Sequence, residues 1–478
     1  MMPSTPKHLV WFRSDLRTAD QMALRSAAAG REGVVGLYVL SPADWLRHDM
    51  APARVEFLLR SLECLSQDLR AFNIPLLVRT AADWRDVPGV VLGVMREVGC
   101  EDLHVNREYE IHEAQRDEQT GSLVRAAGLR MSSYHDQTIL PPGEVLTQTG
   151  GPYTVFSPFK RAWFAVLLNQ GGLRVAGLPA RQPENPLASD PIPTAIAGFA
   201  SAVPAELWPG GEAEATRRLT AFVARGISRY KADRDRADLE GTSTLSPYLA
   251  IGAISPRTCL RAALDANGGQ LDRGGVGEVH WISELVWREF YKHILVAFPR
   301  VCKGRAFKPE SERLRWAENP AHLAAWQAGM TGFPIVDAAM RALSATGWMH
   351  NRLRMITAMF LTKDLFLDWR LGERHFMLNL VDGDLAQNNG GWQWSASTGT
   401  DAAPYFRIFN PASQSRKCDP EGRFIKRWVP ELRDLDGEDI HDPAEWPALF
   451  RPRLDYPELI VDHAASRARV LAAFKALA

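Results

Sequence analysis

"GVVGLYVL" (33–40), "RVEFLLRSLECLSQDLRAF" (54–72) and "IPLLVR" (74–79) follow one another early in the chain. The two short apolar runs are typical of buried strands, and the long segment between them repeats its apolar residues with the period of a helix. A strand, a helix and a second strand in this order predict a parallel sheet, because a helix must carry the chain back before the next strand can pair.

Three further runs extend this pattern: "HLVWF" (8–12), "DLHVN" (102–106) and "RMSSYH" (130–135). We therefore predict an α/β domain over residues 1–135, with a doubly wound parallel sheet of the Rossmann-like kind. The first strand is not followed by the GxGxxG fingerprint of dinucleotide-binding proteins. The sheet alone therefore identifies no ligand.

The rest of the chain divides into two parts. Residues 136–211 are rich in Pro and Gly, and "GLPARQPENPLASDPIPTA" (177–195) has five Pro in nineteen residues. Such a composition predicts a long linker that wraps over the surface. From 212 to 478 the pattern is almost wholly helical, with breaks at Gly or Pro. The predicted fold class is α/β plus all-α, with the helical domain at 212–478.

The composition is that of a globular protein, except for 15 Trp in 478 residues. The five Cys are scattered without a CxxC pair, which argues against a disulfide framework and a zinc site, and we predict no metal. We see no secretory leader and no apolar run of the ~18 residues that span a membrane, so we expect a cytoplasmic protein without a membrane partner. Lys and Arg equal Asp and Glu, at 56 each, so a nucleic-acid partner would need a local basic patch.

Two stretches are candidates for a ligand site. "DGDLAQNNGGWQW" (382–394) combines carboxylates, adjacent amides, two indoles and a Gly pair that would let the backbone approach a ligand closely. "EGTSTLSPYLAIGAISPR" (240–257) places four hydroxyl groups before a predicted helix. Hydroxyls at a helix start suit a phosphate, although an ordinary helix cap is an equal alternative.

Two helical stretches carry further polar groups. In "WISELVWREFYKH" (281–293), Glu284 shares one face with Trp281 and Arg288, and an ion pair with Arg288 is the simpler alternative. In "GWMHNRLRMITAMF" (347–360), one face carries Asn351, Arg354, Met355 and Ala358, and Met there is more often core than ligand contact. Together the four stretches predict a cavity suited to a large planar redox cofactor that carries phosphates.

These stretches, with "WFRSDLRTAD" (11–20) and "STGTDAAPYFRIFNP" (397–411), resemble the photolyase and cryptochrome family over essentially the whole chain. The branch most similar is the class I cyclobutane-pyrimidine-dimer photolyases of microbes. The resemblance implies FAD as cofactor and UV-damaged DNA as partner of a monomeric protein. It also implies that excited reduced FAD gives an electron to a flipped-out dimer, whose ring splits and returns the electron.

The resemblance assigns flavin contacts to particular positions. Asn388 would face the central redox nitrogen of the ring, and Asp382 would pair with Arg354 beside it. The family pattern has a basic residue where this chain has Thr244. The full set of flavin-binding positions is Tyr230, Thr242, Ser243, Thr244, Leu245, Ser246, Trp281, Asn351, Arg354, Asp382, Gly383, Asp384 and Asn388.

The resemblance also assigns a pocket for the flipped dimer. Trp287 and Trp394 would be its walls and Met355 its floor, while Glu284 and Asn351 would hydrogen-bond the thymine edges, with Glu284 supporting the radical anion. Between 341 and 430 the chain has twelve Lys and Arg against eight Asp and Glu. The predicted phosphate ligands there are Arg352, Arg407, Arg416 and Lys417, and ordinary solvated charges are the alternative.

Two other functions compete with repair: a cryptochrome-like blue-light photoreceptor, and a flavin electron-transfer protein without a DNA role. Plant cryptochromes carry an acid, and animal cryptochromes a thiol, where this chain has Asn388. Six-four photolyases have a His pair where this chain has Asn351 and Met355. These residues favour repair of the cyclobutane lesion.

A second chromophore is also implied by the resemblance. The folate-type pattern is similar to what this chain shows at His48, Glu113, Cys302 and Lys303, so we expect 5,10-methenyltetrahydrofolate as a light-harvesting antenna. His112 stands where folate-binding relatives have Asn. An imidazole replaces only one of the two hydrogen-bonding ends of an amide, which predicts a weaker folate site.

Three of the Trp residues match a chain of indoles that carries electrons from the surface to photoexcited FAD: Trp392, Trp369 and Trp316. The alternative is that all three simply fill the core. The two interpretations differ at Trp316, whose charged neighbours predict partial exposure.

Overall fold

The computed structural model describes residues 6–445 and 455–477, which form two compact units. The sheet unit consists of 6–228, 243–299 and 381–383, and the helical unit of the remaining described residues. Each unit is described by itself. Helices from 212 onward contribute to both units, so the predicted boundaries at 1–135, 136–211 and 212–478 stay a prediction.

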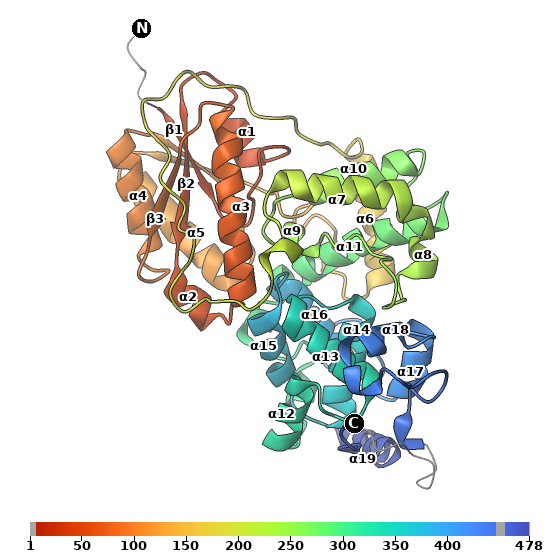
Figure 1. The fold of residues 1–478 in the computed structure, drawn as a ribbon. Helices are drawn as coiled ribbons and strands as arrows, with labels where there is room; N and C mark the ends of the chain where they lie inside the picture. Colours follow the sequence, from red (N-terminus) through yellow and green to blue (C-terminus); the bar gives the residue numbers. More distant parts are fainter. Residues whose placement is uncertain (1–5, 446–454, 478) are drawn as a thin grey trace. The chain divides into compact units, whose positions relative to one another are not determined.

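The sheet unit contains the predicted parallel sheet (Figure 1). Its strands are β1 (His8–Phe12), β2 (Val34–Leu40), β3 (Leu76–Thr80), β4 (Asp102–Asn106) and β5 (Arg130–Tyr134). Their order is β3-β2-β1-β4-β5, and all four pairings are parallel. The order reverses between β1 and β4, so the sheet is doubly wound as predicted.

Five helices accompany these strands: α1 (Met22–Ala27), α2 (Pro42–Arg47), α3 (Pro52–Arg70), α4 (Val87–Val98) and α5 (Ile111–Ala126). Every residue of β2 is buried, as is expected of a parallel strand that is covered on both faces. The residues that alternate along β1 and β2 form one core with Val91 and Met95 of α4 and Val124 of α5. Helix α3 lies on the other side of the sheet in Figure 1.

The linker prediction is wrong for residues 156–169, which form helix α6 (Phe156–Asn169). Its buried residues include Phe156, Phe159 and Trp163, which lie on one helical face. The indole nitrogen of Trp163 donates to Glu289 at 2.7 Å. The many Pro and Gly residues around this segment obscured its helical period. The Pro-rich run at 177–195 forms neither helix nor strand, as predicted.

The sheet unit also contains α7 (Glu212–Arg225), α9 (Ser246–Ala250), α10 (Pro256–Ala266) and α11 (Val276–Ala297), with the 3-10 turn η1 (Ala205–Leu207) before them. These helices meet the loop after β1 closely. A Cβ atom on Gly252 would lie 2.2 Å from the main-chain oxygen of Ser14, so only Gly fits there. The amide of Leu16 donates to the carbonyl of Ile251 at 3.2 Å.

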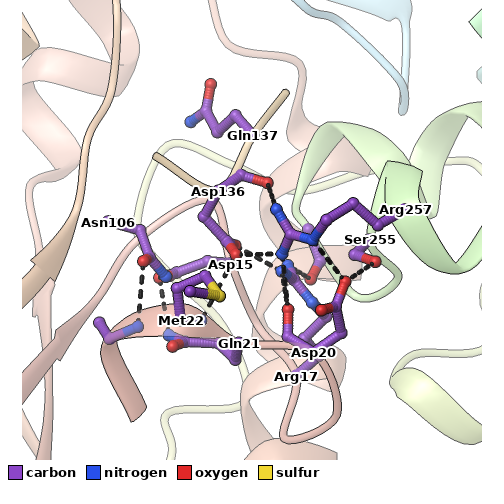
Figure 2. Close-up of polar contacts among 12 residues, drawn as sticks. Asp15, Arg17, Asp20, Gln21, Met22, Asn106, Asp136, Gln137, Ser255 and Arg257 are labelled. Atoms are coloured by element: carbon purple, nitrogen blue, oxygen red, sulfur yellow. Dashed lines mark hydrogen bonds and ion pairs between the residues drawn. The ribbon is translucent and has the colours of Figure 1, made fainter. Parts of the chain in front are cut away.

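A buried group of charges, which we call the ion cluster, joins the sheet to α10 (Figure 2). Arg257 donates to Asp20 at 2.8 Å and to Asp136 at 2.5 Å, and Arg17 also pairs with Asp136. All four side chains are less than a tenth exposed. The cluster lies at the carboxyl ends of β1 and β5. The charged side chains of Arg17, Asp20 and Asp136 at this edge of the sheet are therefore occupied by ion pairs within the cluster.

The helical unit contains no strand among its described residues. Its helices are α8 (Tyr230–Asp233), α12 (Pro320–Ala328), α13 (Pro334–Thr346), α14 (Asn351–Met359), α15 (Trp369–Asn379), α16 (Leu385–Ala396), α17 (Pro411–Cys418), α18 (Arg423–Trp428) and α19 (His463–Lys475). The shorter turns are η3 (Val301–Lys303), η4 (Pro309–Arg313), η5 (Phe360–Asp364), η6 (Pro430–Leu432) and η7 (Pro443–Glu445); η2 (Ile227–Arg229) spans the boundary of the units. Residues 334–396, the segment from α13 to α16, supply most of its core.

Within 6–445 and 455–477, no helix is long and apolar enough to cross a membrane. The same residues hold no group of three or more His, Cys, Asp or Glu that could bind a metal ion.

Candidate functional site

The residues expected to bind the flavin divide between the two units. The sheet unit holds Ser243, Thr244, Leu245, Ser246, Trp281, Asp382 and Gly383. The helical unit holds Tyr230, Thr242, Asn351, Arg354, Asp384 and Asn388.

The hydroxyl turn before α9 does not act as an ordinary helix cap. The N-cap of α9 is Leu245, which makes no side-chain cap hydrogen bond. Thr244 has a φ of 49°, in the left-handed region that is unfavourable for a β-branched residue. Its hydroxyl accepts a hydrogen bond from the guanidinium of Arg218 in α7 at 3.1 Å. The alternative of a plain cap is therefore wrong, and the turn is strained and held from a neighbouring helix.

Helix α11 positions the aromatic residues of the sheet unit. Trp281 is buried, with its ring centroid 5.1 Å from that of Phe222. Trp287 is half-buried and stacks on Phe156 of α6, with 3.6 Å between centroids and 9° between planes. Phe156 therefore supports one face of the indole predicted as a wall of the lesion pocket. Glu284 is half-buried, and Arg288 donates to the carbonyl of Gln137 at 2.6 Å.

The segment 381–383 reaches α3. The guanidinium of Arg54 donates to the carbonyl oxygen of Gly383, and Asp382 is buried beside it in sequence. In the helical unit, Asp384 caps α16 by accepting from the amide of Gln387 at 3.1 Å. A carboxylate at this position satisfies one of the free amides of a helix start.

The amide of Asn388 has a defined orientation. Its nitrogen donates to the main-chain oxygen of Glu373 in α15 at 2.9 Å. Because a carbonyl can only accept, the nitrogen must be the end that faces Glu373. The oxygen of Asn388 is therefore the end left for another donor. The neighbouring Gly391 has nothing within 4 Å of where a side chain would begin, so packing within the helical unit does not explain its lack of one.

The side chain of Glu373 begins a row of hydrogen-bonded side chains. We call this row the amide chain, and its members are Glu373, Asn389 and Gln393. The carboxylate of Glu373 accepts from Asn389 at 2.8 Å, and the amide oxygen of Asn389 accepts from Gln393 at 2.8 Å. The oxygen of Gln393 in turn accepts from the main-chain amide of Phe307 at 2.7 Å. Since Phe307 can only donate here, it defines the orientation of each amide in the chain.

Helix α14 carries the other predicted contacts of the helical unit. His350 caps it, accepting from the amide of Arg352 at 3.2 Å. Asn351 is exposed and Met355 half-buried, while Arg354 donates to the carbonyl of Met349 at 2.8 Å. These placements leave Asn351 accessible to a ligand.

The four predicted phosphate ligands differ in their partners. Arg352 pairs with Asp235 at 2.7 Å, and Arg416 pairs with the exposed Glu438. Arg407 and Lys417 are exposed and make no side-chain hydrogen bond or ion pair within the described part of the chain. Trp394, the second predicted wall, is half-buried.

The three indoles of the predicted electron-transfer chain, which we call the wire, lie in or against one core cluster of the helical unit. Trp369 and Trp392 are fully buried, and a Cβ atom on Gly372 of α15 would lie 2.1 Å from the ring of Trp392. Trp316 is half-buried, as predicted, with its ring 5.1 Å from Phe366. The sequence interpretation missed Trp326, whose ring lies edge-on to Trp392 at 6.0 Å. This arrangement is compatible both with electron transfer through the indoles and with indoles that only fill the core.

Two family descriptions match the chain: "DNA photolyase" over residues 8–184 and "FAD binding domain of DNA photolyase" over residues 281–476. The deoxyribodipyrimidine photo-lyase of Escherichia coli K12 is 45% identical over 98% of this chain and 98% of its own length. The chain belongs to the DNA photolyase family. The corresponding enzyme of Salmonella typhimurium is 46% identical over 98% of this chain and 99% of its own length.

Solved structures agree with this membership. A class III photolyase from Agrobacterium tumefaciens superimposes with a TM-score of 0.88 at 33% identity, over 100% of this chain and 98% of its own. A cryptochrome from Synechocystis superimposes with a TM-score of 0.85 at 26% identity, over 99% of this chain and 100% of its own. Both sides of the photolyase and cryptochrome family therefore share this fold.

The predicted antenna residues of this photolyase-family chain also fall in both units. In the sheet unit, Nε2 of His48 lies 3.2 Å from Nδ1 of His112, and the ring of Trp84 stacks on His112 at 5.5 Å with 4° between planes. Burial and the nearby His112 lower the pKa of His48. Cys302 and Lys303 lie in η3 of the helical unit. His112 is thus engaged by His48 on one nitrogen, which leaves only the other for a ligand.

Glu113 stands in a group of three carboxylates on and before α5. Glu108 pairs with Arg116 at 2.7 Å and Glu110 with Lys292 at 2.9 Å, whereas the carboxyl group of Glu113 accepts from its own backbone amide and has no ion pair within the described residues. Burial, then the charges of Glu110 and Glu108, raise the pKa of Glu113 to about 7.

Three contacts of these sites were not predicted from the sequence: Arg218 at the hydroxyl turn, Phe156 on Trp287, and Glu373 beside Asn388. Arg218 lies among other charged residues of α7, and no pattern distinguishes it from Arg217. Phe156 was hidden in the predicted linker. Glu373 lies 15 residues before Asn388 on another helix, and no local pattern pairs the two.

Proposed function

We propose that this protein repairs cyclobutane pyrimidine dimers in UV-damaged DNA by a light-dependent carbon–carbon lyase reaction. The observation that carries the proposal is the match to enzymes named deoxyribodipyrimidine photo-lyase, at 42–46% identity over nearly the whole chain. A blue-light receptor is less well supported, because the cryptochrome match is only 26% identical.

FAD is the cofactor. When bound in its reduced form and excited by blue light, it supplies the electron that splits the dimer. The donor set of the chain fits such a molecule. The hydroxyls of the turn at 242–246 and the guanidinium of Arg218 suit its phosphates, and the outward oxygen of Asn388 suits a ring N–H.

Asn388 holds the reduced flavin in this proposal. The Glu373 carbonyl engages its nitrogen, so its oxygen is the end that would accept a hydrogen bond from a ring N–H and thereby stabilise the reduced, anionic flavin. Arg354 and Asp382, with Asp384, bind the polar edge of the ring, while Trp281 packs on the cofactor.

The lesion residues bind the flipped dimer. Trp287, backed by Phe156, is one flat apolar wall of the proposed pocket, Trp394 is the second wall and Met355 the floor. Glu284 and Asn351 donate to or accept from the thymine edges, and this contact strengthens as charge develops on the dimer. Arg407 and Lys417, which lack protein partners in the described chain, bind DNA phosphates. Arg352 and Arg416 also bind phosphates, after each leaves the surface carboxylate with which it pairs in the free protein.

Antenna binding is a second element of the proposal. The residues that would hold a folate are His48, His112, Glu113, Cys302 and Lys303, and a folate bound there would supply light harvesting for the flavin. Because His112 offers only one nitrogen and Glu113 titrates near neutrality, we expect weak folate binding that falls as the pH drops below about 7. We expect the protein to act on DNA as a monomer. Action on DNA is consistent with the predicted cytoplasmic location.

The test is a repair assay with purified protein. With FAD reduced beforehand, blue light should remove cyclobutane dimers from an irradiated oligonucleotide, and the same mixture should remove none in the dark. A protein that binds FAD but removes no dimers under light would contradict the repair function and favour the photoreceptor. Failure to bind dimer-containing DNA more tightly than undamaged DNA would favour a flavin electron-transfer protein.

A further inference from the structure

The hydroxyl turn at 242–246 lacks a charge of its own. The turn "TSTLS" contains only hydroxyl and apolar side chains. A group of hydroxyls can bind a phosphate, but it neutralises none of the negative charge. A cation for the phosphates must therefore come from elsewhere in the chain.

Arg218 lies at this turn although it is distant in sequence. It projects from α7, and its Nη1 donates to the hydroxyl of Thr244 at 3.1 Å. The same guanidinium donates through Nε to Glu214 at 2.8 Å and through Nη2 to the carbonyl of Leu207 at 3.0 Å. These contacts hold the group in one place before any ligand arrives.

The guanidinium keeps capacity for a further ligand. It has five N–H donors, three of which are used by the contacts just described, and the hydroxyl of Tyr248 is a further hydrogen-bonding neighbour of the group. At least one N–H therefore remains for a ligand. The side chain is 16% exposed, and its guanidinium carbon lies 5.2 Å from the ring centroids of Trp208 and Tyr248. A planar, immobilised guanidinium with a free N–H suits a phosphate oxygen.

The backbone of the turn supports the same conclusion. A Thr with φ of 49° is strained, and strained residues of this kind gather where a chain binds a ligand. The hydrogen bond from Arg218 to the hydroxyl of Thr244 helps to hold the residue in this unfavourable backbone conformation.

We propose that Arg218 supplies, from α7, the positive charge that binds the phosphate groups of FAD at this turn. This inference rests on the proposed flavin site and identifies its phosphate ligand. Neighbouring Arg217 does not share the role, because it is 65% exposed and its ion pair within the described residues is with Glu214.

The test compares two ligands with the same ring system. FAD and riboflavin are titrated into the apoprotein, and the ratio of their dissociation constants is measured for each variant. Arg218→Gln should weaken FAD about tenfold, which corresponds to ~1.4 kcal/mol, and leave riboflavin unchanged because it has no phosphate. The ratio is insensitive to a misfolded fraction, which would reduce binding of both ligands alike.

Two matched variants complete the experiment. Arg217→Gln makes the same chemical change one residue away and should leave the ratio unchanged. Thr244→Arg in the Arg218→Gln background returns the cation to the turn and should recover most of the lost FAD affinity, with a salt dependence that the single variant lacks.

The results have distinct meanings. An unchanged FAD affinity in Arg218→Gln, an equal loss for riboflavin, or no recovery with Thr244→Arg would each overturn the inference. None of these measurements uses DNA, so the repair assay can fail while Arg218 proves to bind phosphate. If the wild-type protein repairs dimers and Arg218→Gln has the normal ratio, the repair function stands and the assignment of Arg218 is wrong.

Discussion

The ion cluster and the amide chain are both buried polar groups, but they do different things. The ion cluster joins charges from the sheet and α10 in the sheet unit, and every charge is paired with another. The amide chain joins α15 and α16 in the helical unit, and only one of its three side chains is charged. Charges attract from any direction, whereas an amide has a donor end and an acceptor end. The first arrangement therefore holds elements together, and the second fixes the direction of its amides and holds α15, whose Glu373 main-chain oxygen accepts from Asn388, against α16.

The largest effect should follow from breaking the ion cluster. Asp136→Asn removes the charge shared by Arg17 and Arg257, leaving Arg257 with Asp20 and the buried Arg17 without an ion-pair partner among the described residues. Breaking a buried pair in this way costs roughly 3–5 kcal/mol of unfolding free energy. Denaturant unfolding would measure it. The control, Asp436→Asn, breaks the exposed pair with Lys426 and should cost less than about 1 kcal/mol. Similar losses in both variants would show that the cluster is no more important than a surface pair.

The same cluster predicts a stability that does not respond to mild acid. Burial favours the neutral form of Asp136, but Arg17 and Arg257 outweigh it, and the pKa of Asp136 is lowered. A lowered carboxyl pKa contributes stability that is fully present above the unfolded value of about 4 and is lost only as the pH falls through the lower folded value. The stability difference between wild type and Asp136→Asn should therefore be constant from about pH 5 to 8. A difference that shrinks within this range would contradict the assigned charge state.

The amide chain should respond to charge in a way that can be reversed. Asn389→Asp places a second carboxylate against Glu373 and should cost about 2 kcal/mol of unfolding free energy. Adding Glu373→Gln supplies a donor to the new carboxylate and should recover at least about 1 kcal/mol, since the two residues are in contact. The second measurement is the rate at which air oxidises the reduced flavin, which should rise in Asn389→Asp and return in the double variant.

The flavin contact of Asn388 and the role of the amide chain can be tested separately. Asn388→Ala should also speed oxidation of the reduced flavin, because it removes the oriented oxygen itself. If it does not, the flavin contact of Asn388 is wrong. If it does, but Asn389→Asp leaves the rate normal while destabilising the protein, then the amide chain only joins the helices, like the ion cluster.

Trp316→Phe should have a small effect on stability and a large effect on one reaction. The ring is half-buried against Phe366, so the free energy of unfolding should fall by less than about 1.5 kcal/mol. Photoreduction of oxidised FAD should be mostly lost, while repair by chemically pre-reduced protein should be normal. Trp348→Phe, a half-buried indole of the helical unit outside the predicted wire, is the control. Normal photoreduction in Trp316→Phe would reject the wire, and failed repair after pre-reduction would indicate a structural role.

The smallest effect on stability should come from exposed cations. Changing Arg407 and Lys417 together to Ala should leave the unfolding free energy unchanged, because neither side chain has a partner in the described chain. Binding to dimer-containing DNA should weaken, and the slope of log affinity against log salt should become shallower by about one for each lost phosphate contact. Lys475→Ala, an exposed cation at the end of α19, should change neither quantity. An unaltered salt slope in the double variant would leave both residues as ordinary solvated charges.

The sequence predicted a large part of the fold because its signals there are periodic and local. The predicted strands at 8–12 and 102–106 have the observed bounds, and the helix at 54–72 is α3, displaced by two residues at each end. The helix at 156–169 was missed because its neighbours are rich in Pro and Gly, which outweighed a period only four turns long. The candidate site could be located by long motifs, and the partial exposure of Trp316 by its charged neighbours.

By itself the sequence determined the parallel sheet, the helical second half and the family, while the residues that it assigns to a flavin stay a prediction. These depend on alternation, helical period and motifs within short stretches, which the chain carries locally. Only the tertiary structure decided which distant residues act on them: Arg218 on Thr244, Phe156 on Trp287, and Glu373 on Asn388. Such pairs depend on how helices pack and on which end of a side chain faces its neighbour. No local pattern encodes that direction, because the same residues in the same order could face other partners if the helices were turned.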